Sequence, residues 1–338
     1  MKYVLQRLAF SILSLVVLLV LTFLLTHLSA ADPAVVAAGP NAGAEKIAAM
    51  RQEMGLDKSL FVQFLIYCGE ILRGDLGISW FTRQPIINDL AQQLPPSIEL
   101  VVVAMLINLG VSLPLGLITA RYANSRFDDV VRLFVLVGAG LPIFWLAILL
   151  QQFVAGQLHW LPIAGRLDFD NRDFAGPTGF ALIDSLLAGR PDVFGDALAH
   201  LVLPALSLSL LFTAVGVRIT RTSMISEFKK DYVLLARAKG ARDGRIMFRH
   251  VFPNGATPAL TVFGMQFGWM LGATVLVEEI FGRPGVGRYA VKAVTQSDIH
   301  AVVGVVLTVG VVFLVANLLV DILLYLISPL KQRSAASA

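Results

Sequence analysis

Cysteine is nearly absent from this sequence, which has Cys68 alone among its 338 residues. A framework of disulfides and a metal site built from cysteines are therefore both excluded. His250 has no second histidine or cysteine at a spacing that would ligate zinc, so we expect no bound metal ion. An internal repeat with a period of about 20–50 residues is also missing, and a solenoid is not expected.

The phosphate-binding motif of ATP-hydrolysing proteins, G-x-x-x-x-G-K-[ST], does not occur either. The stretch that starts at Gly240 has Arg245 where the second glycine is required, and no strand is predicted before it. We therefore expect the chain not to be an enzyme and to contain no cofactor of its own.

Charge is sparse: charged residues make up 15% of the chain, against about 25% in soluble domains. Hydrophobic residues make up 57%, and the mean hydropathy is +0.75. This composition is typical of a membrane protein. The net charge of +4 and the isoelectric point of about 9.3 would also suit nucleic-acid binding, which the placement of the charges argues against.

Six long apolar runs predict six transmembrane helices in an all-α, polytopic membrane protein. They are Leu8–Leu28, Ile98–Ala120, Leu133–Val154, Leu201–Val217, Leu260–Val277 and Ala301–Ile327. The first run would reach about 31 Å as a helix, enough to span a bilayer. It is longer than the apolar part of a cleaved signal peptide. Pro114, Pro142 and Pro204 lie inside or beside these runs and predict kinks.

These runs predict three parts of the chain: a first segment with one span (1–28), an extracytoplasmic region (29–97), and a core with five spans (98–338). In the second part, Ala44–Gly55 and Ser59–Gly74 have the apolar spacing of helices that lie at the interface or against the bundle. The segment 74–79, GDLGIS, predicts a glycine-rich turn.

The distribution of charge predicts the orientation. With the N-terminus inside, the inner segments 1–7, 121–132, 218–250 and 328–338 hold 16 Lys/Arg and 5 Asp/Glu. The outer segments 29–99, 156–200 and 278–300 hold 11 Lys/Arg and 17 Asp/Glu. An inner excess of positive charge favours both termini inside. The basic charge is then a sign of topology, and we expect no nucleic-acid partner.

The loop 218–256 between the fourth and fifth runs carries seven Lys/Arg between Lys229 and Arg249, so it cannot lie in a bilayer core. It predicts a short helix that breaks at Gly240, then a second helix that Pro253 stops. Small residues at the corner would let the backbone of a partner approach closely. The alternative is an ordinary basic loop that contacts no partner.

The same loop resembles the cytoplasmic loop of ABC importer permeases, whose pattern is E-A-A-x3-G-x9-I-x-L-P. The spacing from Gly240 to Pro253 is kept here, whereas the glutamate, the first alanine and the isoleucine are replaced. The string A-R-A-K-G followed by R-H-x-x-P-N is similar to the dipeptide/oligopeptide/nickel branch. The resemblance implies that these residues dock an ATPase subunit: Asp231, Ala236, Arg237, Ala238, Lys239, Gly240, Ala241, Arg245, His250 and Pro253.

Other strings resemble the same family in the same order: G-D-L-G-x-S at 74–79, W-L-P-x-x-G from Trp160, and E-x-[IV]-F-x-x-P-G-x-G at 278–287. In the last of these we expect a buried Phe281 and a type II turn at Pro284-Gly285, since glycine accepts φ > 0. The alternative is a part in the outer mouth of the pathway. There, Glu278 or Glu279 would meet the ammonium group of a substrate.

Two acidic features remain. Asp321, in a string N-L-L-V-D that is also common in the family, is the carboxylate inside the last run, and such a group is a functional candidate by default. Pairing with a neighbouring helix or the inner loop is the role we expect. The acidic loop 156–200 lacks the D-x-D-x-D-G pattern of calcium loops and predicts a solvated face.

The resemblance covers nearly the whole chain and implies a type I ABC importer permease in the cytoplasmic (inner) membrane. It further implies four partners: a homologous second permease subunit, two ATPase subunits that bind ATP and magnesium, and a periplasmic or lipid-anchored solute-binding protein. We expect di- or oligopeptides as substrates, with nickel chelates or oligosaccharides as alternatives. A secondary transporter, the competing class, would show intramembrane ionisable pairs and repeats.

Overall fold

The computed structural model describes residues 2–28, 43–53 and 56–327, and within them the side chains other than those of 2–8, 27–28, 53, 321 and 323–327. This part of the chain is helical and contains no strand; its β-type pairing is one bridge between Ile78 and Pro85. The all-α prediction is confirmed for the described residues.

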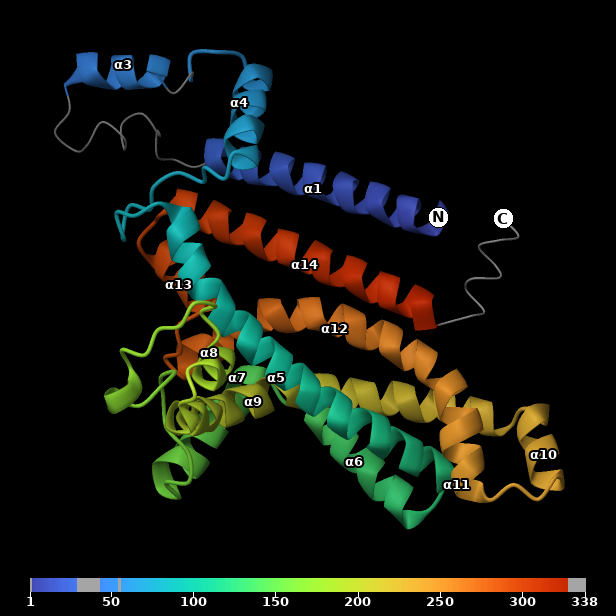
Figure 1. Ribbon diagram of the computed structural model, residues 1–338. Helices are drawn as coiled ribbons and strands as arrows, with labels where there is room; N and C mark the ends of the chain where they lie inside the picture. The colour runs from blue at the N-terminus through green and yellow to red at the C-terminus, as the bar shows by residue number, and fades with distance from the viewer. Residues whose placement is uncertain (1, 29–42, 54–55, 328–338) are drawn as a thin grey trace. The chain divides into compact units, whose positions relative to one another are not determined.

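Five helices are long and apolar enough to cross a membrane. They are α1 (Lys2–Leu28), α5 (Ile86–Arg121), α9 (Pro191–Phe228), α12 (Phe252–Ile280) and α14 (Ile299–Ile327) (Figure 1). At 1.5 Å per residue, the 38 residues of α9 extend about 57 Å. A hydrocarbon core is about 30 Å thick, so α9 continues well beyond it.

The third predicted run, Leu133–Val154, is a broken helix. Its residues belong to α6 (Arg126–Gly140), α7 (Ile143–Leu150) and the π-helical turn η1 (Gln151–Gln157), with a bend of 101° at the break. Pro142 occupies the N-cap of α7. Because proline lacks an N–H and clashes with the preceding turn, the helix stops instead of kinking as we expected. The count of six spans holds when this pair is taken as one span.

By their contacts, the residues group into two compact units, which we describe separately. One comprises 6–91 and 290–311, and the other comprises 92–289 with 312–338 and 1–5. Helices α1, α5, α13 (Val286–Thr295) and α14 contribute residues to both.

In the smaller unit, α3 (Ala44–Glu53) and α4 (Leu60–Leu72) confirm the two predicted helices. Helix α4 packs against α1: the Tyr67 hydroxyl donates to Thr22 Oγ1 at 3.0 Å, and the Phe23 and Phe64 rings meet edge to face. The expected glycine turn is present, with Gly74 and Gly77 at positive φ. Its end is held by the buried carboxylate of Asp298, which accepts from Ser79 Oγ at 2.7 Å.

In the larger unit, small residues bring the long helices close together. A Cβ added to Gly216 of α9 would lie 2.5 Å from Ser112 Oγ of α5. Beside this crossing, Asn108 of α5 donates to Gln266 of α12 at 2.7 Å, and Gln266 donates to the Phe212 carbonyl of α9 at 3.0 Å. Buried amides that satisfy one another in this way tie α5, α9 and α12 together within an apolar interior.

Candidate functional site

The basic loop between α9 and α12 consists of α10 (Asp231–Ala238), α11 (Asp243–Arg245) and a π-helical turn, η3 (Ile246–Val251) (Figure 1). Helix α10 ends in a Schellman motif, in which Ala241 N–H donates to the Ala236 carbonyl and Gly240 N–H to the Arg237 carbonyl. Gly240 has φ +76°, which glycine adopts without strain. The prediction of two short helices joined at this glycine is confirmed.

A hydrophobic core of its own supports the loop. Val233, Ile246 and Val251 are buried and pack with Leu117 of α5 and Met224 of α9, among others. An ion pair joins Arg121, at the end of α5, to Asp243 of α11. The loop is therefore packed on the ends of α5 and α9, and its movement requires movement of these helices.

A second set of contacts ties α10 to the end of α9 and to η3. The Tyr232 hydroxyl lies 2.9 Å from a carboxylate oxygen of the buried Glu227 and 3.3 Å from the His250 carbonyl. Burial raises the pKa of Tyr232, so this hydroxyl keeps its proton at neutral pH and donates it to either acceptor.

The solvent-exposed surface of the loop is unusually apolar for a segment with seven Lys/Arg residues. Leu234 and Leu235 of α10 and Phe248 of η3 expose 57%, 56% and 63% of their surface. These three were not among the predicted site residues, because the periodicity of such short helices does not show which face is buried. Ala238 is exposed as expected, whereas Ala236 is half-buried against the core of the loop.

The other predicted residues of the loop divide by exposure. Exposed are Asp231, Arg237, Lys239, Gly240, Arg245 and Pro253; Ala241 packs on the core of the loop and His250 is half-buried. Pro253 does not end a helix, contrary to our prediction. It lies in the first turn of α12, directly after η3, where Phe252 N–H donates to the Met247 carbonyl. The π-helical turn before it lets the helix continue through the proline, which lacks the N–H that would donate into that turn.

The segment after α12 corrects a prediction about its turn. Phe281 is buried as expected, but the positive φ belongs to Gly282, at +57°, and not to Gly285. Gly285 is needed for a different reason: a Cβ there would lie 2.2 Å from the Glu278 carboxyl carbon. Pro284 is half-buried in the same turn.

Glu278 and Glu279, predicted as alternatives at an outer gate, have different surroundings. Glu278 is fully buried; its carboxylate accepts from Ser97 Oγ at 2.5 Å and from Arg288 N–H at 3.1 Å. The same Ser97 oxygen accepts from Val286 N–H at 2.8 Å, so Glu278 ties α5 to this turn. Glu279 is exposed, with a carboxylate oxygen 3.8 Å from Arg288 Nε, and of the two it alone is accessible to a substrate.

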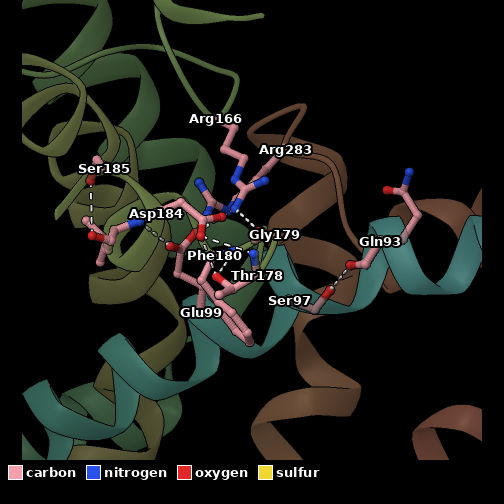
Figure 2. A network of polar contacts seen from close by, with 11 residues as sticks. Gln93, Ser97, Glu99, Arg166, Thr178, Gly179, Phe180, Asp184, Ser185 and Arg283 are labelled. Atoms are coloured by element: carbon pink, nitrogen blue, oxygen red, sulfur yellow. Dashed lines mark hydrogen bonds and ion pairs between the residues drawn. The ribbon is translucent and has the colours of Figure 1, made fainter. Parts of the chain in front are cut away.

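Figure 2 shows a buried ionic cluster beside this turn that sequence reasoning missed. Glu99 Oε2 of α5 accepts from Arg283 Nη2 at 2.9 Å and from Arg166 Nη2 at 3.3 Å, and Glu99 Oε1 accepts from Leu182 N–H of α8 (Ala181–Leu187) at 2.8 Å. Burial lowers the pKa of Arg283 to about 10, which Glu99 opposes, so Arg283 stays charged at neutral pH. Arg166 follows the W-L-P-x-x-G string directly, the one sequence signal that pointed here.

The acidic loop 156–200 holds the one group of possible cation ligands within the described residues: Asp168, Asp196 and His200. Asp196 already accepts from the backbone N–H of Asp168 at 3.0 Å and from Asn171 Nδ2 at 2.9 Å. These contacts fasten the loop with its short helix η2 (Phe169–Asn171) to α9, and the carboxylate serves that purpose.

The predicted intramembrane carboxylate, Asp321, lies in α14, but its side chain falls outside the described part of the structure. Its pairing with a neighbouring helix or loop stays a prediction.

The sequence is similar to known membrane transport proteins over nearly its whole length. Residues 112–333 match the family described as binding-protein-dependent transport system inner membrane component, and residues 1–101 match the N-terminal part of that component. The chain is 34% identical to a dipeptide transport system permease protein of Alkalihalophilus pseudofirmus and 36% identical to one of Escherichia coli K12, covering 97% of this chain and 98% of each relative. It is 37% identical, with the same coverage, to a di/tripeptide transport system permease protein of Pseudomonas aeruginosa. The chain thus belongs to the multi-pass inner-membrane permease components of binding-protein-dependent ABC transport systems.

Proposed function

We propose that this chain forms half of the membrane pathway of an ABC importer for dipeptides and short oligopeptides, and that separate ATPase subunits drive it through the loop 231–253. The observation that carries the proposal is the exposed apolar surface of Leu234, Leu235 and Phe248 on a loop with a packed core beneath it. A loop that buries Val233, Ile246 and Val251 while it exposes three large apolar side chains favours a partner on that surface.

The packing of the loop also supports a route by which movement of an ATPase subunit would reach the membrane helices. The core under the loop includes Leu117 of α5 and Met224 of α9, two helices long enough to cross the membrane. A displacement of α10 by an ATPase would therefore move the inner ends of both helices. The buried amide contacts of Gln266 would pass this motion to α12.

The orientation that we propose places both termini and the basic loop in the cytoplasm, as the distribution of charge favours. The ionic cluster around Glu99 and the turn after α12 then lie on the outer side, where a solute-binding protein docks. A homologous second permease subunit completes the pathway, and two ATPase subunits supply ATP and magnesium binding. Peptides are proposed as substrates because the relatives named above are described as dipeptide and di/tripeptide permeases.

The decisive experiment is uptake of a radiolabelled dipeptide into vesicles that contain the complete importer and an excess of its binding protein. We expect uptake to require ATP on the side of the membrane that the loop 231–253 faces, which is the cytoplasmic side in the proposed orientation. Uptake should persist when an ionophore collapses the proton gradient. Uptake that follows the proton gradient without ATP would contradict the proposal and favour a secondary transporter.

The orientation can be tested at the single cysteine. Cys68 lies half-buried on α4, and burial raises the pKa of its thiol. Because the thiolate is the reactive form, we expect slow labelling by a membrane-impermeant maleimide at pH 7 and a rate that increases about tenfold per pH unit below the pKa. Labelling from the outer side of right-side-out vesicles, lost in Cys68→Ser, would support the orientation. Labelling confined to inside-out vesicles would contradict it.

A further inference from the structure

A groove between α6 and α9 is not used by the proposed transport mechanism. It has a volume of about 330 Å³, and its walls are mostly aliphatic, with Val135, Leu136 and Ala139 from α6 and Val215 from α9 among them. Three arginines, Arg132, Arg218 and Arg221, line the same groove.

The arginines gather at one end of the groove because the two helices run antiparallel. Near the start of α6, Asp128 pairs with Arg221 of α9; ten residues later, Gly138 faces Leu210 and Ala214, further from the C-terminal end of α9. Arg132 and Arg218 therefore lie toward the charged end, and the small and branched side chains line the remainder.

Charge is not balanced at that end. Arg221 makes a bidentate pair with the buried Asp128, with both N–O distances at 2.6 Å, and Arg132 pairs with Asp129. Arg218 is exposed and has neither a hydrogen bond nor an ion pair from its side chain to any residue that the structure describes. Three guanidinium groups thus face two carboxylates, and one positive charge is uncompensated.

The charged end coincides with the level at which the apolar runs of both helices end. Arg132 directly precedes the run that begins at Leu133, and Arg218 directly follows the run that ends at Val217. In a bilayer this is the level of the lipid headgroups, while Val135, Leu136 and Ala139 lie at the level of the acyl chains. On α6, Leu136 in the groove and Phe134, two residues before it, expose large apolar side chains.

We propose that this groove binds an anionic phospholipid, with the headgroup phosphate on Arg218 and an acyl chain along the aliphatic wall of α6 and α9. An apolar groove that ends in an unpaired guanidinium fits the two halves of such a lipid, and basic pockets between membrane helices are known to bind anionic headgroups. The inference rests on the proposed function and orientation in one respect: they assign the lipid to the inner leaflet, beside the end of α9 that leads into the loop.

The test is the thermal stability of the purified complete importer in detergent, titrated with phosphatidylglycerol and, in parallel, with phosphatidylcholine or inorganic phosphate. We expect phosphatidylglycerol alone to raise the melting temperature at saturating lipid. Arg218→Gln should weaken its apparent affinity by about five- to tenfold, the effect of one cation near an anionic headgroup. Arg126→Gln, on the same helix but outside the groove, is the matched control and should leave the affinity unchanged.

A second pair of variants tests the apolar part without altering charge. Ala139→Trp fills the groove and should reduce the phosphatidylglycerol that copurifies with the importer, measured by mass spectrometry. Val137→Trp, on an exposed position that does not line the groove, should not.

Three results would overturn the proposal: equal stabilisation by phosphatidylcholine, full reproduction of the effect by inorganic phosphate, or loss of subunit assembly in Ala139→Trp with unchanged lipid content. The last would assign the groove to a helix of the second permease subunit. None of these readouts requires transport, so failure of peptide uptake would count against the proposed function alone.

Discussion

Replacing Gly240 with valine is expected to abolish the stimulation of ATP hydrolysis by loaded binding protein. Insertion into the membrane and docking of the binding protein on the outer side should remain normal. At φ +76° a β-branched residue is strongly disfavoured. No atom lies within 4 Å of the position that a Cβ would take, so the effect comes from the backbone and not from a clash. The Schellman motif should open and α11 should lose its place relative to α10.

Gly244 provides the matched control for this experiment. It lies four residues later in α11, has no positive φ, and also has open space around its Cβ position. Gly244→Val should therefore leave coupling close to that of the unmodified importer. Asparagine tolerates the left-handed region, so Gly240→Asn should retain most of the stimulation. If ATP hydrolysis in both Gly240→Val and Gly244→Val were stimulated as strongly as in the unmodified importer, the loop would be an ordinary basic segment.

Replacing Glu99 with glutamine is expected to destabilise the protein strongly. It would leave the buried guanidinium group of Arg283 without its hydrogen-bonded carboxylate, and the half-buried guanidinium group of Arg166 with the Gly179 carbonyl as its remaining acceptor. Breaking a buried ion pair costs about 3–5 kcal/mol. Nε and Nη1 of Arg283 already lack a hydrogen-bond partner, so the electrostatic attraction of Glu278 is what remains to offset the loss. The measurement is the midpoint of thermal unfolding of the purified importer in detergent.

Two further variants make this result specific to the buried charges. Glu279→Gln removes an exposed carboxylate from the adjacent turn and should change stability by about 0.5 kcal/mol or less. The double variant Glu99→Gln/Arg283→Met should recover part of the stability, because it removes one of the two uncompensated charges. If Glu99→Gln were as stable as Glu279→Gln, the cluster would not contribute to the fold.

Much of this protein was predictable from local sequence. Apolar runs about 20 residues long can be buried only in lipid or in a large core, so they revealed all-helical spans without any knowledge of packing. Gly240 could be assigned a left-handed turn because the conformational freedom of glycine is a property of one residue and its neighbours. The order of short motifs was enough to identify the family.

What the sequence did not determine depends on residues that meet only in the folded chain. Glu99 and Arg283 are 184 residues apart, and Ser97 and Glu278 are 181 apart; no periodicity connects them. For this reason Glu278, which lies beside an exposed Glu279, was indistinguishable from it until its surroundings were known. Gly285 likewise looked like a turn residue, when it is needed to admit a carboxylate from the preceding helix.

The two misjudged prolines show the same limit in the backbone. Pro142 breaks a helix by 101°, whereas Pro253 lies at the start of a continuous one. Both prolines lack the N–H donor and crowd the residues before them, yet a helical turn, η3, directly precedes α12 and Pro253. Whether the chain then bends or continues is decided by what the freed groups and apolar side chains can pack against, as the core around Val251 shows for Pro253. That choice belongs to tertiary structure, because the partners come from α5 and α9, far away in the sequence.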